Sequence, residues 1–493
     1  MAEKRPELIP RRLAYPMTFL ALVFSWLAIL WPVPKGLFWQ SDTFWLIEVG
    51  RHILQSHRLP QVDPYSFTSQ KDLWIVYQWL TEVAFAMANS QLALLGVALL
   101  GSVVLAYLLC VLIFRRMLKV GSNPFAAFIT ILLVFHSTHP EISSIRPQLF
   151  SFVFAFILQC MLEDVWTSSQ KQNILVLLGK VFLLSVFWTN CHISFPLGLC
   201  MLFLYLCAAT ADKFVSRQKE PSRIPVLASM TSMFAFGTLL NPYGIELWHF
   251  ALKLNQLYPS AESQPLNWFA MGAYGVAYCL FLLSALCTWK RVAFPRLLLA
   301  LALFIAGCLH ARFMIYFCIS TSPLVAQALT QLLTKRTNSV LRSAGKRVSE
   351  VAFSKIYPVA VVSLACLVVY MQPLYAGMRP LPVGAAEYLN SHQPSGNMFC
   401  SADAGSYLIY RLRGSVRVFI DPRLDLYDPS FVREYAATMM AQDWKPIFAK
   451  YDIGEALIPN DTKIAQAIDK DKDWEMIYKD AQYRIVRRSS SQR

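Results

Sequence analysis

The sequence predicts a polytopic α-helical membrane protein of about eleven transmembrane helices, followed by a C-terminal extracytoplasmic α/β domain. Of the 493 residues, 56% are hydrophobic and only 15% are charged, whereas a soluble protein carries about 25% charged residues. Several apolar runs approach or exceed the roughly 20 residues that a membrane helix needs. The C-terminal stretch 374–493 differs, because it holds 16 basic and 15 acidic residues and no such run.

These properties exclude several classes of protein. A soluble enzyme, a disordered chain and a fibrous repeat do not have this composition. An outer-membrane barrel has alternating strands rather than continuous apolar runs. The eleven cysteines show neither a disulfide framework nor the spacing of a zinc site.

The apolar runs place the membrane spans along the chain. Arg11 and Arg12 precede a first run that is too long for a signal peptide and lacks a small-residue cleavage site, so we expect it to be retained. The third and fourth runs are short, which fits tilted, partly buried or re-entrant helices. The predicted spans are 13–32, 91–114, 124–137, 148–162, 173–190, 194–211, 225–241, 271–289, 293–310, 313–332 and 356–373.

Lys and Arg residues predict the orientation of these spans. With a cytoplasmic N-terminus, the inner segments hold 21 Lys and Arg, against 7 in the outer segments up to residue 373. The inner segments are 1–12, 115–123, 163–172, 212–224, 290–296 and 333–355. The net charge of +15 is therefore a topology signal, and nucleic acid is excluded as a partner. We predict a multi-pass protein of the cytoplasmic (inner) membrane, with residues 1–373 as the transmembrane domain and 374–493 outside.

The first outer loop, about residues 33–90, opens with a predicted amphipathic helix. Glu48, Arg51, His52 and Gln55 share one polar face, opposite an apolar stripe, which is typical of a helix at the membrane interface. Asp42 stands at the start of this helix. It is either an N-cap or a general base that deprotonates an acceptor hydroxyl, and the two roles are compatible. Asp63-Pro64-Tyr65-Ser66 predicts a turn.

The other outer segments supply further candidates for binding a substrate. The second outer loop contains His139, Glu141 and Arg146. Arg146 is either a phosphate-binding cation or a solvated, snorkelling side chain, and the histidines form at best a weak metal signal. His192 lies at another outer turn, where a structural role is the more common one. Arg312 begins a span and is a second candidate for binding a phosphate.

The C-terminal domain shows short elements of both kinds. We predict strands at Val416–Ile420, Ala456–Ile458 and Arg484–Val486, and helices at Gly384–Ser391 and Ser430–Met440. The motif Asp421-Pro422-Arg423-Leu424-Asp425 follows the first strand. It predicts either an ion-pair network at a strand end, which we favour, or hydrogen bonds to an acceptor sugar.

Several of these motifs together resemble the GT-C-type integral membrane glycosyltransferases. The likeness is greatest to poorly characterised bacterial members related to protein mannosyltransferases and lipid A aminoarabinose transferases. It covers nearly the whole chain. The matching segments are Asp42-Thr43-Phe44-Trp45-Leu46, Gly50-Arg51, Asp63-Pro64-Tyr65-Ser66, Arg146-Pro147-Gln148-Leu149-Phe150-Ser151, Trp188-Thr189-Asn190-Cys191-His192, Asn241-Pro242-Tyr243-Gly244 and Val418-Phe419-Ile420-Asp421-Pro422-Arg423-Leu424-Asp425-Leu426-Tyr427.

This resemblance implies a GT-C-like fold and a catalytic acid in the first outer loop, which Asp42 matches. It also implies a polyprenyl-phosphate sugar donor, whose phosphate would meet Arg146 or Arg312. The acceptor would be a glycan, lipid or protein arriving from the outer side. Better-known members pair two acids in this loop, whereas here the next acid is Glu48, which does not share a helical face with Asp42.

The sequence thus predicts Asp42 as the catalytic residue, with Glu48, Arg51, His139, Glu141, Arg146, His192 and Arg312 binding substrate. No cofactor is expected, and a divalent metal has little support. Two alternatives remain open. One is a catalytically silent GT-C-like scaffold for envelope assembly. The other is a lipid or glycolipid transporter, although the polar groups lie at the outer boundary rather than at the midplane.

Overall fold

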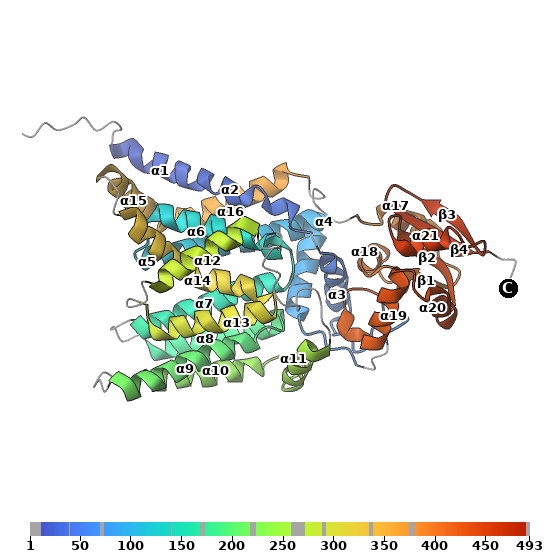
Figure 1. Ribbon diagram of the computed structural model, residues 1–493, viewed down its shortest axis with the longest axis horizontal. Coiled ribbons are helices and arrows are strands. Elements are labelled where there is room, and N and C mark those ends of the chain that lie inside the picture. Colours follow the sequence, from blue (N-terminus) through green and yellow to red (C-terminus); the bar gives the residue numbers. More distant parts are fainter. Residues whose placement is uncertain are drawn as a thin grey trace, which may run out of the picture.

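The computed structural model describes residues 11–38, 40–69, 73–139, 141–167, 173–216, 223–257, 272–287, 292–334, 339–373 and 380–489. The described residues form a bundle of apolar helices with a smaller α/β domain at one end (Figure 1). The predicted boundary after residue 373 adjoins 374–379, which lie outside the described residues. The same is true of parts of the predicted inner segments 1–12, 163–172, 212–224, 290–296 and 333–355.

Each predicted span coincides with a helix. By length and apolar composition, six described helices can cross a membrane, or seven if a pair bent by 80° is counted. Shorter apolar helices occupy the remaining spans, so the count of about eleven stays a prediction. The bundle comprises α1 (Arg11–Ser25), α2 (Leu27–Leu30), α4 (Trp79–Ala106), η2 (Tyr107–Ile113), α5 (Phe114–Lys119), α6 (Pro124–Thr138), α7 (Gln148–Thr167), α8 (Ile174–Cys191), α9 (Pro196–Ser216), α10 (Ile224–Thr238), α12 (Gly272–Cys287), α13 (Phe294–Leu309), α14 (Phe313–Thr334) and α16 (Ile356–Met371).

The first outer loop ends at a kink inside α4. Leu92 and Ala93 have non-helical backbone angles, and Ala93 has a positive φ of 51°. The kink lies next to residue 91, where the hydropathy predicts the second span to begin. The kink therefore separates the helical segment 79–91, in the predicted first outer loop, from the apolar segment that belongs to the bundle.

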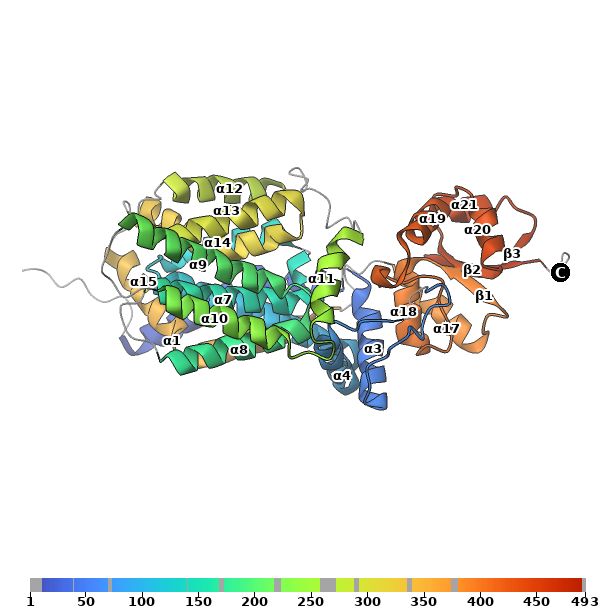
Figure 2. The ribbon, with the colours of Figure 1, turned by 90° about the horizontal axis from the view of Figure 1, so that it is seen from below.

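The amphipathic helix of the first outer loop is α3 (Asp42–Ser56), and its surroundings differ from those expected. It lies between the bundle and the C-terminal domain (Figure 1 and Figure 2). All residues from Thr43 to Gly50 are buried, including Glu48 at 6% exposure. Gly50 permits a close crossing, because a Cβ there would lie 1.9 Å from the carbonyl oxygen of Glu82 in α4. The bundle and the C-terminal domain therefore cover most of this helix, and its position at the membrane interface stays a prediction.

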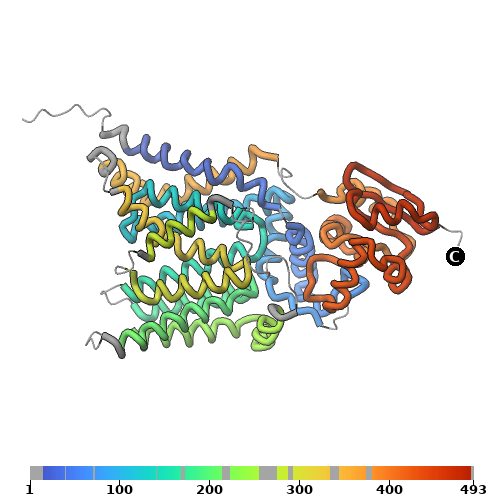
Figure 3. Tube along the Cα trace, in the orientation of Figure 1, coloured from blue at the N-terminus to red at the C-terminus, as the bar shows by residue number. Residues whose placement is uncertain are grey.

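Two amphipathic helices appear where the sequence predicts only loops. The helix α11 (Glu246–Leu257) lies at the end of the bundle nearest the C-terminal domain, and α15 (Ser339–Ala352) lies at the opposite end (Figure 1). The tube in Figure 3 follows the chain from that opposite end, where α1 begins, to the C-terminus in the α/β domain.

The C-terminal domain has a four-stranded sheet of order β1-β2-β4-β3. The strands β1 (Asn397–Cys400) and β2 (Ile453–Pro459) pair parallel, and the hairpin of β3 (Trp474–Lys479) and β4 (Tyr483–Arg488) adds antiparallel. The predicted strands at 456–458 and 484–486 are confirmed within β2 and β4. The domain's helices are α17 (Val383–Ser391), α18 (Ala402–Leu412), α19 (Pro429–Met439), α20 (Trp444–Lys450) and α21 (Lys463–Ile468).

The predicted strand Val416–Ile420 is wrong. This segment is outside the sheet, and its one bridge, at Val418, joins Ser66 of the first outer loop. Val418 N donates to Tyr65 O at 2.9 Å, and Phe67 N donates to Val418 O at 3.2 Å. An apolar run of this length marks a buried extended segment, but it does not reveal which partner takes its backbone hydrogen bonds.

The C-terminal domain also holds the first turn of α3. Ser41, the residue before this helix, makes no capping bond with its own side chain. Instead, Ser406 of α18 donates to Ser41 O and accepts from Trp45 N, and Ser41 Oγ donates to Asp403. The Ser406 side chain of the C-terminal domain thus satisfies backbone groups at the start of α3, in the first outer loop.

Candidate active site

A cavity of about 480 Å³ opens where the end of the bundle nearest the C-terminal domain meets α3, α11 and that domain. Such a volume lies in the range of small-molecule binding sites. Its polar lining residues are Asp42, Tyr77, Gln78, Arg146, Gln148, His192, Ser194, Arg312, Tyr316, Arg423 and Asp425. Its apolar wall comes mainly from α9, α11 and α13, with Leu197, Met201, Leu204, Leu252, Leu299 and Leu303 among its members.

Asp42 and Arg146 meet in this cavity. Asp42 is the first residue of α3, so it is not the N-cap. Its Oδ2 lies 3.0 Å from Nε of Arg146, and the indole of Trp45 donates to its Oδ1 at 3.4 Å. The Asp42 side chain is 17% exposed and the Arg146 side chain is 24% exposed. A carboxylate and a cation, both accessible from the cavity, therefore lie in direct contact.

The loop that carries Arg146 is tied to α3 by the backbone. Thr43 Oγ1 donates to Ile145 O at 2.7 Å, and Ile145 N donates to Leu37 O at 2.8 Å. Because Thr43 follows Asp42 and Ile145 precedes Arg146, these bonds set the separation of the two charged side chains.

His192 lies in a hydrogen-bonded group at the cavity wall. Its Nδ1 is 2.9 Å from both Ser151 Oγ and Ser194 Oγ, and Tyr316 Oη donates to Ser194 Oγ at 3.3 Å. Burial lowers the pKa of His192 to about 3, with further contributions from the positive charges of Arg146 and Arg312. His192 is therefore neutral at physiological pH, and both arginines are near enough to act on it.

This depressed pKa predicts a pH-dependent stability. Between pH 3 and the ordinary histidine value of 6.5, the unfolded chain binds a proton that the folded chain does not, so stability is full above pH 6.5 and falls below it. His192→Asn retains a polar group beside Ser151. When the pH falls from about 7.5 to about 4.5, we expect the free energy of unfolding to decrease less in this variant than in the unsubstituted chain. The difference is up to about 3 kcal/mol, since each pH unit below 6.5 corresponds to about 1.4 kcal/mol.

Thermal unfolding of the purified protein in detergent at the two pH values measures this difference. His57→Asn is the matched control. His57 is exposed and follows α3 with its own backbone in the left-handed conformation, which Asn tolerates. An equal loss of stability in His192→Asn and the unsubstituted chain would contradict the assignment.

Four of the sequence-predicted site residues do not line the cavity. Glu48 and Arg51 form an ion pair on the far side of α3, and burial raises the pKa of Glu48 to about 7. His139 contacts Ser143 at 2.9 Å, and Glu141 accepts from Gln40 at 3.0 Å. A substrate-binding role for these four stays a prediction, and it would have to operate outside this cavity.

Other lining residues were not selected from the sequence. Tyr77 and Gln78 lie in the predicted first outer loop, Ser194 begins a predicted span, and Tyr316 lies inside the predicted span 313–332. Neither their residue types nor their spacing distinguishes them from structural residues. Asp425 belongs to the motif 421–425, for which hydrogen bonds to an acceptor sugar are the less favoured interpretation, yet its side chain also lines the cavity.

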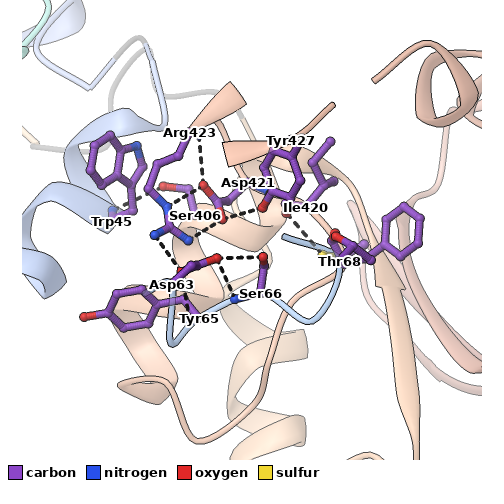
Figure 4. A network of polar contacts seen from close by, with 12 residues as sticks. Trp45, Asp63, Tyr65, Ser66, Thr68, Ser406, Ile420, Asp421, Arg423 and Tyr427 are labelled. Atoms are coloured by element: carbon purple, nitrogen blue, oxygen red, sulfur yellow. Dashed lines mark hydrogen bonds and ion pairs between the residues drawn. The ribbon is translucent and has the colours of Figure 1, made fainter. Parts of the chain in front are cut away.

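Beside the cavity, Arg423 joins the two domains (Figure 4). Its guanidinium bonds Asp421 at 2.7 and 2.8 Å and Asp63 of the first outer loop at 2.8 Å, and each of the three side chains is at most 1% exposed. The ring of Trp74 lies 4.7 Å from the guanidinium carbon. The predicted ion-pair network therefore exists, but it spans two domains. Asp63 also accepts from Tyr65 N and Ser66 N, which confirms the predicted turn.

No group of three or more His, Cys, Asp or Glu side chains in the described part of the chain is arranged to hold a metal ion.

Comparison with solved structures shows the fold. One similar structure is the archaeal oligosaccharyltransferase AglB from Archaeoglobus fulgidus, in complex with an inhibitory peptide and a dolichol-phosphate. It superposes with a TM-score of 0.55 at 11% identity, over 91% of this chain and 70% of the AglB chain. ArnT from Cupriavidus metallidurans, bound to undecaprenyl phosphate, superposes over 97% of this chain and 98% of its own with a TM-score of 0.53 at 12% identity.

The apo form of ArnT gives the same TM-score of 0.53 at 10% identity. No family model and no curated protein matches the sequence. At such identities the likeness concerns the fold alone, which this chain shares with AglB and ArnT.

Proposed function

We propose that this protein is a membrane glycosyltransferase that moves a sugar from a polyprenyl-phosphate-linked donor to an acceptor on the extracytoplasmic face. The observation that carries the proposal is the content of a single cavity: the carboxylate of Asp42, the cations Arg146 and Arg312, and a long apolar wall. Sugar transfer from such a donor requires a base, a cationic site for the phosphate and a surface for the lipid.

The arginines bind the phosphate, and the apolar wall binds the isoprenoid chain. A sugar-linked phosphodiester carries one negative charge, and the leaving lipid phosphate carries two. Cations beside it therefore interact more strongly with the transition state than with the donor, which is the condition for lowering the barrier. The structures of AglB and ArnT, named with dolichol-phosphate and undecaprenyl phosphate respectively, support a lipid phosphate as ligand.

Asp42 acts as the general base. An acceptor hydroxyl loses its proton to the Asp42 carboxylate as its oxygen bonds to the anomeric carbon of the sugar, while the bond from that carbon to the phosphate oxygen breaks. Arg146 Nε lies 3.0 Å from Asp42 Oδ2 and so pairs with the carboxylate. A donor phosphate attracts Arg146 as well, and this competition frees the carboxylate for the acceptor proton.

The orientation follows from charge and from the placement of the cavity. The basic helices α5 and α15 lie at the end of the bundle away from the C-terminal domain (Figure 1). Placing that end in the cytoplasm of a cell with an inner membrane puts the cavity and residues 380–489 outside. The acceptor is then a glycan, a lipid or a protein of the cell envelope. A cavity at the outer end favours transfer over transport, for which midplane sites are typical.

Replacing Arg312 tests the phosphate site. We expect Arg312→Ala to raise the dissociation constant for undecaprenyl phosphate by about 10- to 100-fold, because a hydrogen bond to a charged group is worth about 1.5–3 kcal/mol. Native mass spectrometry of the detergent-solubilised chain measures the bound fraction. Arg58→Ala is the control, since Arg58 is an exposed outer cation remote from the cavity lining. Equal affinities of the two variants would remove Arg312 from the phosphate site.

A further inference from the structure

The C-terminal domain contributes a carboxylate to the cavity. Asp425 lies in the 3₁₀ turn η7 (Leu424–Leu426), is 8% exposed, and lines the same cavity as Asp42. These two acids are 383 positions apart in the sequence. The second acid of this site therefore comes from the other domain, and not from the helix that carries Asp42.

The turn that carries Asp425 is held rigidly. Arg423, two residues earlier, is fixed by Asp421 on one side and by Asp63 on the other. Leu426 N donates to Arg423 O at 3.0 Å, and Tyr427 Oη donates to Asp421 at 2.9 Å. A side chain on such a turn keeps its position without rearranging when a ligand arrives, which lowers the entropic cost of binding.

Tyr77 lines the same cavity as both acids. Burial raises the pKa of its phenol, and the negative charges of Asp425 and Asp42 raise it further. Tyr77 thus stays protonated and can donate a hydrogen bond in the cavity. Its ring packs against Phe250 of α11 with centroids 5.4 Å apart, which restricts its orientation.

This combination of groups matches a polyhydroxylated ligand. A carboxylate accepts hydrogen bonds and a phenol donates and accepts them, whereas sugar hydroxyls both donate and accept. The positive charge of Arg423 is shared between two buried carboxylates, so the phosphate is bound by Arg146 and Arg312 instead. The side of the cavity formed by the C-terminal domain is therefore the one suited to hydroxyl groups.

We propose that Asp425, together with Tyr77, binds hydroxyl groups of a sugar-bearing acceptor and so sets acceptor specificity from the C-terminal domain. This inference rests on the proposed glycosyl transfer. The acceptor enters past the C-terminal domain, its sugar is held by Asp425, and its attacking hydroxyl is presented to Asp42. Asp425 is thus a binding residue, and the proton passes to Asp42 alone.

The test separates transfer to the acceptor from transfer to water. The purified full-length chain is given undecaprenyl-phosphate-linked radiolabelled hexoses and pentoses, with and without a detergent extract of cell envelopes as the acceptor source. Labelled extract reports transfer, and free labelled sugar reports hydrolysis. We expect Asp425→Asn to lower transfer at limiting extract by about 10-fold or more. Excess extract should restore it, and hydrolysis should stay within about twofold, since water does not use the hydroxyl subsite.

Undecaprenyl phosphate binding, measured in parallel, shows that the variant is folded, and Asp473→Asn, an exposed acid of the same domain, is the control. Unchanged transfer in Asp425→Asn overturns the subsite. A parallel fall of transfer and hydrolysis also overturns it, because that result assigns Asp425 to the donor or to the fold. If the unsubstituted chain consumes no donor and binds no undecaprenyl phosphate, the proposed glycosyl transfer itself fails.

Discussion

Asp42→Asn is expected to lower the rate of sugar transfer by about 10²–10⁴-fold, the range typical of removing a general base. Asparagine has nearly the same shape as aspartate but cannot take the acceptor proton. Binding of undecaprenyl phosphate should persist, and it could strengthen because Arg146 loses its carboxylate partner at 3.0 Å. Turnover of a radiolabelled lipid-linked sugar and native mass spectrometry measure the two quantities on the same preparation.

The matched control for this variant is Glu246→Gln. Glu246 is an exposed acid on α11, close to the cavity but not among its lining residues, and we expect transfer to stay within about twofold of the unsubstituted rate. Full transfer by Asp42→Asn would refute its role as base. A chain that supports envelope assembly equally well with either substitution, and turns over no donor, would instead be the catalytically silent scaffold.

Arg423→Ala is expected to destabilise the chain by about 3–5 kcal/mol, because it leaves two buried carboxylates without their cation. The side chains of Asp63 and Asp421 are each at most 1% exposed. The loss also breaks the connection between the first outer loop and the C-terminal domain. The yield of monodisperse protein in size-exclusion chromatography and the thermal unfolding midpoint in detergent should both fall.

Arg411→Ala provides the comparison for this effect. Arg411, on α18 in the same domain, lies 3.7 Å from Glu387, and both side chains are more than half exposed. A surface ion pair of this kind contributes at most about 1 kcal/mol. If Arg423→Ala has a normal yield and unfolding midpoint but loses binding of the acceptor, then Arg423 binds a ligand directly and the structural role is refuted.

The membrane helices were predictable from the sequence because their signal is local. A run such as 313–332 is apolar along its whole length, so the segment and its helix α14 agree within two residues at each end. The orientation of these helices stays a prediction from the Lys and Arg counts, which depend only on position in the chain. In the C-terminal domain, the periodicity located β2 and β4 but assigned 416–420 to a sheet that it does not join.

The site was predictable only in part. Asp42, Arg146, His192 and Arg312 stood out because polar groups at the ends of membrane spans are rare and costly, and the fold brings these four to one cavity. Glu48 and Arg51 stood out as the polar face of the amphipathic helix, but the turn of α3 directs them to the opposite side, where they form an ion pair with each other. Nothing in the local pattern distinguishes the two cases.

The sequence by itself determined the class of protein, the positions of the membrane helices and the face on which polar residues gather. Hydropathy is a sum over neighbouring residues, and the bilayer imposes the length over which that sum matters. Only the tertiary structure decided which polar residues share a cavity. Asp42, Arg312 and Asp425 lie on different elements, and their proximity depends on the packing of α3 between the bundle and α18. That packing is set by contacts between distant segments, which no local pattern records.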